Sequence, residues 1–152
     1  MDIDEFNFEV KESTIPDSGK GVFAKRDFKQ GSIICEYKGV LMPIEQYKRG
    51  MVGDDRSIGY NDKYQLVGYP DNLGAYINDI VVFREYTVDE LKKCIRENKY
   101  PMHEGKQYNC DYLGKFNRIW VIATSDIEAG NELFASYGPD YWHARMIEKG
   151  WL

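Results

Sequence analysis

The sequence has few of the residues that build metal centres or disulfide frameworks. Its 152 residues include three cysteines, Cys35, Cys94 and Cys110, and two histidines, His103 and His143. The cysteines are odd in number and form no Cys-x-x-Cys pair, which favours reduced thiols and no structural zinc. Cys35 and Cys110 are expected in the core.

Long apolar runs are also missing. No stretch approaches the roughly 18 apolar residues of a membrane-spanning helix, and residues 1–6 have neither the basic nor the apolar part of a secretory signal. We therefore expect a soluble intracellular protein, nuclear or cytoplasmic, or located in a host nucleus if the source is viral or microbial.

Positive charge is not in excess either. The 25 acidic and 20 basic residues give a net charge of -5, which argues against a dedicated DNA-backbone binder and suits a basic peptide partner. Asp54 and Asp55, in the polar loop 51–57, either contact such a peptide or are simply solvated. No direct nucleic-acid or membrane contact is expected.

Tyrosine, in contrast, is abundant, with 12 residues. The rings are either ordinary strand residues or the lining of a polar, aromatic pocket. The length predicts one domain over residues 1–152, large enough for a core without disulfides.

Hydrophobic periodicity predicts a mainly β protein with few short helices. Strands are expected at 6–12, 22–24, 32–41, 64–67, 108–113, 118–124 and 131–137, and helices at 43–50, 87–98 and 141–150. In the clearest helix, 87–98, Thr87 and Glu90 form a capping box, and Val88, Leu91 and Ile95 mark an apolar face.

Three short motifs each allow a structural and a functional interpretation. Gly19-Lys20-Gly21 is either a plain turn or a loop whose backbone approaches a ligand. Asn78, behind an apolar pair, either caps local backbone or binds something polar. Residues 131–138 end on Tyr137-Gly138, which is either an ordinary strand end or a tyrosine held over a pocket.

The order of these motifs resembles that of the SET domain, the β-rich family of protein lysine methyltransferases. Gly19-Lys20-Gly21, Tyr37-Lys38-Gly39, Tyr76-Ile77-Asn78 and Glu132–Gly138 follow one another in the family order, within residues 6–142. The resemblance implies several small curved sheets, β-clip-like, with a knot-like C-terminal region. It also implies S-adenosylmethionine as cofactor and a protein or peptide substrate with a basic segment, such as a histone.

The resemblance assigns roles by position. The cofactor-binding residues that it implies are Gly19, Lys20, Gly21, Tyr76, Asn78, Asp79, Tyr141 and Trp142. Tyr137 corresponds to the catalytic tyrosine, with Tyr37 and Tyr64 completing a lysine channel. Such a channel suits the chemistry, because a lysine of pKa about 10.4 must lose its proton before attack and an aromatic wall favours the neutral amine by desolvation. No metal is required.

Departures from the family pattern leave a second hypothesis open. Asp79 replaces a histidine, and residues 80–108 form an insert; the carboxylate is tolerated if the histidine acts through its backbone, or it repels the cofactor's carboxylate. Ala135 leaves room for higher methylation unless Tyr108, Tyr112 or Phe116 fills it. The middle of the chain is similar to the PR-domain branch, and no cysteine cluster follows Gly138. The alternative is therefore a catalytically inactive SET-like module that binds a peptide or protein partner.

Overall fold

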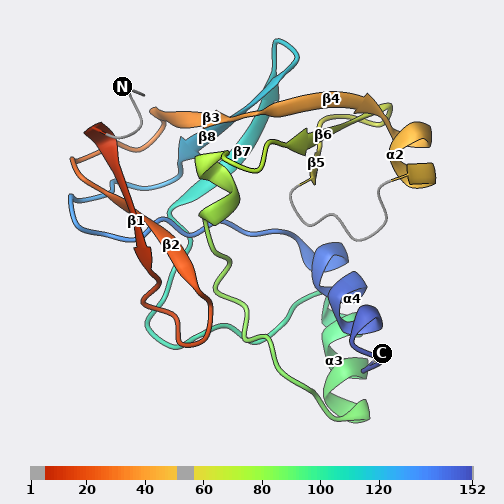
Figure 1. The fold of residues 1–152 in the computed structure, drawn as a ribbon. Helices are drawn as coiled ribbons and strands as arrows, with labels where there is room; N and C mark the ends of the chain where they lie inside the picture. Colours follow the sequence, from red (N-terminus) through yellow and green to blue (C-terminus); the bar gives the residue numbers. More distant parts are fainter. Residues whose placement is uncertain (1–5, 51–56, 152) are drawn as a thin grey trace.

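The computed structural model describes residues 6–50 and 57–151 and contains three small antiparallel sheets (Figure 1). The first pairs β1 (Phe8–Glu12) with β2 (Lys20–Ala24); the second has the order β3 (Ile33–Tyr37), β8 (Arg118–Ala123), β7 (Cys110–Lys115); the third has the order β4 (Gly39–Pro43), β6 (Tyr64–Gly68), β5 (Ser57–Gly59). The helices are α2 (Ile44–Gly50), the 3-10 turn η1 (Leu73–Tyr76), α3 (Val88–Glu97) and α4 (Pro139–Glu148). This confirms the prediction of a mainly β fold with few short helices. None of the helices described is both long and apolar enough to cross a bilayer.

The strand predicted over 32–41 is wrong as a single element, because the chain changes sheet at Lys38. The Lys38 amide donates to Oδ1 of Asn72 at 2.9 Å, and its carbonyl accepts from the amide of Tyr69 at 3.0 Å. The next residue must be glycine, since a Cβ atom on Gly39 would lie 2.2 Å from the carbonyl oxygen of Val67. One residue therefore separates β3 from β4.

The main core lies between the first two sheets and the C-terminal segment. Val22, Val121 and Leu133 are fully buried in it, and both Cys35 and Cys110 are buried there as predicted. Removing this apolar surface from water stabilises the fold by about 25 cal/mol per Å².

The strand predicted over residues 131–137 does not form, although the segment is extended and buried. Its amides are shared among different partners: Leu133 donates to the carbonyl of Val22, Phe134 to the side chain of Asn109, and Ala135 to the carbonyl of Asn78. A regular strand needs consecutive pairs with one neighbour, and only isolated bridges occur here. The segment thereby joins three distant parts of the chain.

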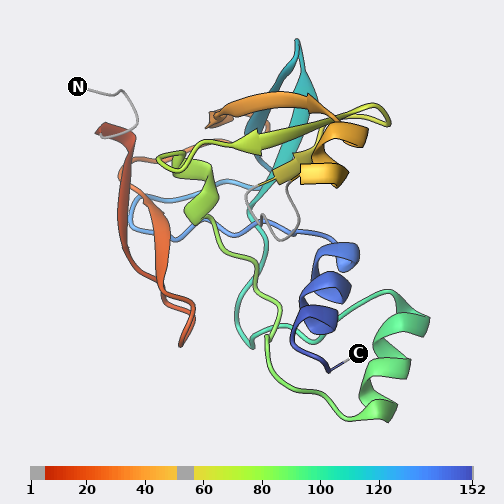
Figure 2. The ribbon, with the colours of Figure 1, turned by 45° about the vertical axis from the view of Figure 1, so that its right-hand side comes forward.

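A second core lies between α3 and α4, which run side by side in both views (Figures 1 and 2). The capping box of Thr87 and Glu90 is confirmed. The predicted apolar face of α3 is wrong in part: Leu91 and Cys94 are buried, whereas Val88 and Ile95 are 67% and 48% exposed. Because α3 packs Leu91 and Cys94 in the same cluster as Trp142 and Met146 of α4, the insert stabilises the C-terminal helix.

Candidate functional site

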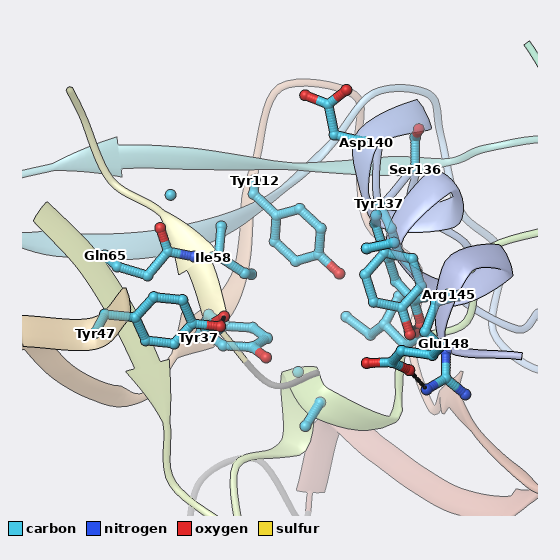
Figure 3. A pocket seen from close by; sticks show the side chains of 17 residues that line it. Tyr37, Tyr47, Ile58, Gln65, Tyr112, Ser136, Tyr137, Asp140, Arg145 and Glu148 are labelled. Atoms are coloured by element: carbon cyan, nitrogen blue, oxygen red, sulfur yellow. Dashed lines mark hydrogen bonds and ion pairs between the residues drawn. The ribbon is translucent and has the colours of Figure 1, made fainter. Parts of the chain in front are cut away.

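A cavity of about 610 Å³ lies where η1, α4 and the second and third sheets meet. Five tyrosines line it, Tyr37, Tyr47, Tyr112, Tyr137 and Tyr141. Figure 3 shows the hydroxyl groups of Tyr37 and Tyr112 directed toward the open space, with Tyr137 on the wall formed by the C-terminal segment. The abundance of tyrosine is thus partly explained by an aromatic pocket with phenolic oxygens.

Tyr137 is fixed at both its backbone and its side chain. Its amide donates to Oδ2 of Asp79 at 2.9 Å, and its hydroxyl donates to the carbonyl oxygen of Ile77. Burial raises the pKa of Tyr137 well above its ordinary value of 10, with the proximity of Tyr141 and Asp79 adding to the effect. The phenol is therefore neutral at physiological pH and can orient a ligand but not act as a base.

Tyr37 and Tyr112 form the neighbouring wall. Their rings pack edge to face with centroids 5.8 Å apart, and Tyr37 is buried. Burial also raises the pKa of Tyr112 well above 10, followed by the effect of Tyr137. Three phenols thus line one space, and their hydroxyl oxygens can hydrogen-bond to a neutral amine, which an apolar pocket could not do.

Acidic side chains from α4 lie at the same cavity. Asp140 and Glu148 both line it, and Glu148 forms an ion pair of 2.9 Å with Arg145 (Figure 3). Arg145 offsets one of the two negative charges. The remaining carboxylate of Asp140 suits a ligand that carries positive charge near the phenols.

The Gly-x-Gly loop is packed against Glu132, a residue to which the sequence assigned no role. The buried carboxylate of Glu132 accepts from Oγ of Ser13 at 2.7 Å and from the amide and hydroxyl of Thr14 at 2.8 and 2.6 Å. A Cβ atom on Gly21 would lie 2.2 Å from Oε2 of Glu132. Gly21 therefore allows a close approach between the loop and the segment that leads to Tyr137.

Asn78 contacts the Gly-x-Gly loop and Glu132, which are distant in sequence, and does not cap its local backbone. Its side-chain amide donates to the carbonyl of Lys20 at 3.1 Å and to Oε2 of Glu132 at 3.3 Å. Within the described residues its Oδ1 accepts no hydrogen bond. An acceptor is thus left over beside the exposed backbone of Gly19, whose φ is +65°.

The side chain of Asp79 points inward. It is only 6% exposed and accepts four hydrogen bonds, one of them from the indole nitrogen of Trp142 at 2.9 Å. Trp142 in turn packs between Phe83 and Tyr137, with centroids 5.6 and 5.9 Å away. Asp79 is therefore not positioned to repel a ligand, because both of its carboxylate oxygens accept hydrogen bonds from the protein.

Of the remaining predicted residues, some line the cavity and others do not. Tyr141 reaches the cavity and packs on Tyr137 at 4.8 Å, whereas Tyr76 is exposed at the end of η1. Tyr64 is 40% exposed at the start of β6 and does not line the cavity, so it is not brought to Tyr37 and Tyr137. Asp54 and Asp55 lie outside the described residues.

Of the side chains proposed to fill the space near Ala135, one lies in the cavity. Tyr112 lines it, Tyr108 hydrogen-bonds to Asp79 at 2.5 Å, and Phe116 is 77% exposed at the turn between β7 and β8. The sequence did not indicate Tyr47 or Ile77 as lining residues. Only the pairing of β4 with β6 and the position of η1 bring them there.

Comparison with known proteins agrees with this geometry. A profile of the SET domain matches residues 19–138. The N-lysine methyltransferase KMT5A of Xenopus tropicalis is 28% identical over 134 residues, 85% of this chain and 36% of that protein. KMT5A-A of Danio rerio is 28% identical over 130 residues, 82% of this chain and 33% of that protein. The Variant-silencing SET domain-containing protein of Plasmodium falciparum is 24% identical over 124 residues, 82% of this chain and 4% of that protein.

This chain therefore spans about a third of the length of the first two relatives and a small part of the third. Two of these relatives are named as N-lysine methyltransferases and the third as a SET domain-containing protein. Because the profile match covers most of the described residues, the chain belongs to the SET-domain family.

Proposed function

We propose that this domain transfers a methyl group from S-adenosylmethionine to a lysine side chain of a protein. The observation that carries the proposal is the convergence of the Tyr37, Tyr112 and Tyr137 side chains on one cavity. The pKa of both Tyr112 and Tyr137 is raised by burial, so these groups remain neutral where a lysine amine must lose its proton.

The cofactor, when bound, supplies the methyl group on a sulfonium, from which a neutral amine displaces the sulfide in line. Tyr137 and Tyr37 would orient the amine nitrogen, and the aromatic wall would exclude water from it. The hydroxyl of Tyr137 donates to Ile77, which leaves the phenolic lone pairs free to accept from the amine. The lysine ammonium must release its proton to solvent before the aromatic wall encloses it, since the buried phenol of Tyr137 is no base.

The residues around Gly19–Gly21 fit the methionine part of this cofactor. The free Oδ1 of Asn78 suits an ammonium group, and the exposed backbone of Gly19 and Lys20 supplies further polar groups. Tyr76, Tyr141 and Trp142 are proposed to lie toward the adenine, with Trp142 acting mainly by support because it is buried. Asp79 contributes to this region through its backbone.

The proposed substrate is a protein segment with positive charge beside the target lysine. Asp140 lines the cavity and Glu148 adds a partly compensated charge. A histone tail is the candidate that we would test first, which places the activity in the nucleus, with a cytoplasmic basic protein as the other candidate. The domain boundaries belong to the same proposal: one domain over residues 1–152, a core over 6–142 and an insert over 80–108.

Two measurements test this function. Calorimetry with S-adenosylmethionine should show binding, and absence of binding at millimolar cofactor would favour an inactive peptide-binding module. A methylation screen with radiolabelled cofactor against histones, basic non-histone proteins and acidic control proteins should label only basic substrates. Binding of cofactor without label in any lysine substrate would reject the transferase assignment.

A further inference from the structure

Like Glu132, Asp79 is a buried carboxylate among the described residues that accepts four hydrogen bonds. Both oxygens of its carboxylate accept two hydrogen bonds each, and the donors divide by oxygen. Oδ1 accepts from the amide of Val81 at 3.1 Å and from the hydroxyl of Tyr108 at 2.5 Å. Oδ2 accepts from the amide of Tyr137 and the indole of Trp142, both at 2.9 Å.

The Oδ1 donors mark the two ends of the insert. Val81 and Tyr108 lie at the beginning and end of residues 80–108, and backbone pairing joins the same ends: Val82 donates to the carbonyl of Pro101 at 2.9 Å and His103 to that of Ile80 at 2.8 Å. The insert is therefore closed at its base, and one oxygen of Asp79 belongs to that closure.

The Oδ2 donors belong to the proposed reaction centre and to the helix beside it. The rings of Tyr137 and Trp142 stack at 20° with centroids 5.9 Å apart, so the two residues that donate to Oδ2 also pack against each other. Trp142 lies in the second core with Leu91 of α3, and Figures 1 and 2 show α3 beside α4. The carboxylate thus connects the insert to the backbone that holds Tyr137.

A carboxylate offers about four acceptor positions, and here all four are occupied by protein donors. Such a group fixes its partners strongly, because leaving any of these buried donors unpaired is costly. We propose that Asp79 is a positioning residue that holds Tyr137 and Trp142 in place relative to the insert, so that the insert supports methyl transfer. The effect on methyl transfer rests on the proposed function, whereas the contacts of Asp79 with Tyr137 and Trp142 do not.

The geometry predicts an order among Asp79 variants. Asp79→Ala removes all four acceptor positions. Asp79→Asn keeps one oxygen, which can face Tyr137 and Trp142. Its amide then faces the Tyr108 hydroxyl, which can accept as well as donate, and the Val81 N–H, which is left without its acceptor. We therefore expect kcat to fall about 100-fold in Asp79→Ala and to be partly rescued in Asp79→Asn.

A structural readout tests the contact without any need for activity. In the full chain labelled with 15N-tryptophan, the indole proton of Trp142 should move upfield in Asp79→Ala and stay near its wild-type position in Asp79→Asn. The indole of Trp120, which donates to the carbonyl of Lys115, is the internal reference and should not move. An unmoved Trp142 resonance in a folded Asp79→Ala protein would overturn the inference.

A second variant keeps the test decisive if Asp79→Ala fails to fold. Tyr108→Phe removes only the insert's hydroxyl donor from Oδ1, and we expect kcat to fall about threefold to tenfold with KM unchanged. Tyr86→Phe is the matched control: Tyr86 lies in the same insert, but its hydroxyl donates to the carbonyl of Val82, so kcat should stay at the wild-type value. Equal kcat values for the two variants would overturn the positioning role.

The two hypotheses fail in different ways. If the wild-type protein transfers no methyl group to any lysine substrate, the proposed function is rejected, whereas the indole resonances still decide whether Asp79 holds Trp142. If the wild type is active and neither Asp79→Ala nor Tyr108→Phe lowers kcat, the positioning role is rejected and the function stands.

Discussion

The hydroxyl of Tyr137 donates a hydrogen bond to the main-chain carbonyl of Ile77, a residue 60 positions earlier in the chain. Both residues line the cavity, so this bond sets the orientation of the phenol relative to the end of η1. An oriented phenol can direct the lone pair of an amine without itself losing a proton.

Replacing Tyr137 with Phe should therefore impair chemistry more than binding. We expect kcat to fall about 100-fold because the amine loses its orienting oxygen, while the Kd for S-adenosylmethionine changes less than about twofold. The loss of one hydrogen bond should lower the free energy of unfolding by about 1 kcal/mol. Single-turnover kinetics and calorimetry measure these effects.

Tyr69→Phe is the control, since Tyr69 is exposed and does not line the cavity. Wild-type turnover in Tyr137→Phe would remove Tyr137 from the reaction centre.

Gly21→Ala should weaken cofactor binding through Glu132. The added methyl group would sit 2.2 Å from Oε2 of Glu132, which Ser13 and Thr14 hold in place. We expect a stability loss of about 1–3 kcal/mol and at least about tenfold weaker cofactor binding, because the loop or the carboxylate must move.

Gly105→Ala separates strain from this specific clash. Unlike Gly21, Gly105 has a left-handed φ, +77°, and its Cβ direction faces open space. That variant should lose about 1 kcal/mol of stability and keep its cofactor affinity. If Gly21→Ala binds the cofactor as tightly as Gly105→Ala does, the loop is not the cofactor site.

The number of methyl groups transferred should depend on Tyr112. Its hydroxyl faces the cavity between Tyr37 and Tyr137 (Figure 3), so Tyr112→Phe removes an oxygen and leaves room for an additional methyl group. We expect mass spectrometry of the product to shift toward more highly methylated lysine. Phe116→Ala, at an exposed turn, should leave the product pattern unchanged; an identical pattern in Tyr112→Phe would assign the limit to another side chain.

Alkaline pH should destabilise the fold through its buried phenols. Burial raises the pKa of Tyr86 to about 12, while a tyrosine in the unfolded chain ionises near its ordinary value of 10. Since the folded state binds the proton more tightly, stability is retained below about pH 10 and falls as the pH rises toward 12. Urea unfolding between pH 8 and 11.5 should show this decline, by at most roughly 1 kcal/mol per pH unit for each such phenol.

Tyr86→Phe should make that decline shallower, although the variant starts from a lower stability because it lacks the bond to Val82. An equally steep decline in the variant would show that other groups control alkaline unfolding.

The parts that could be predicted from the sequence are those set by neighbours along the chain. Thr87 and Glu90 cap α3 through contacts three residues apart, and the turn between β7 and β8 forms at Phe116 and Asn117, both with positive φ. The order of motifs likewise predicted that Tyr37 and Tyr137 meet, and both line the cavity.

The parts that could not be predicted depend on distant partners. The break at Lys38 is set by the side chain of Asn72, and the irregular course of residues 131–137 by three separate segments. The direction of the Asp79 side chain was open because the sequence shows a charge but not its donors. Tyr64 illustrates the converse, since a motif position alone did not bring its ring to the cavity.

The contacts of the 131–137 segment determine when the cavity and the Gly-x-Gly loop can be completed. Glu132 bonds to Ser13, 119 positions earlier, so neither the Gly-x-Gly loop nor the tyrosine wall is complete before residues 131–137 have been synthesised. Closing such long loops is entropically costly and slow, and the contacts stabilise the fold only when all partners are present. A nascent or truncated chain that ends before Asn131 therefore holds β1 and β2 without their buried carboxylate and lacks the part of the cavity wall that Ser136 and Tyr137 form.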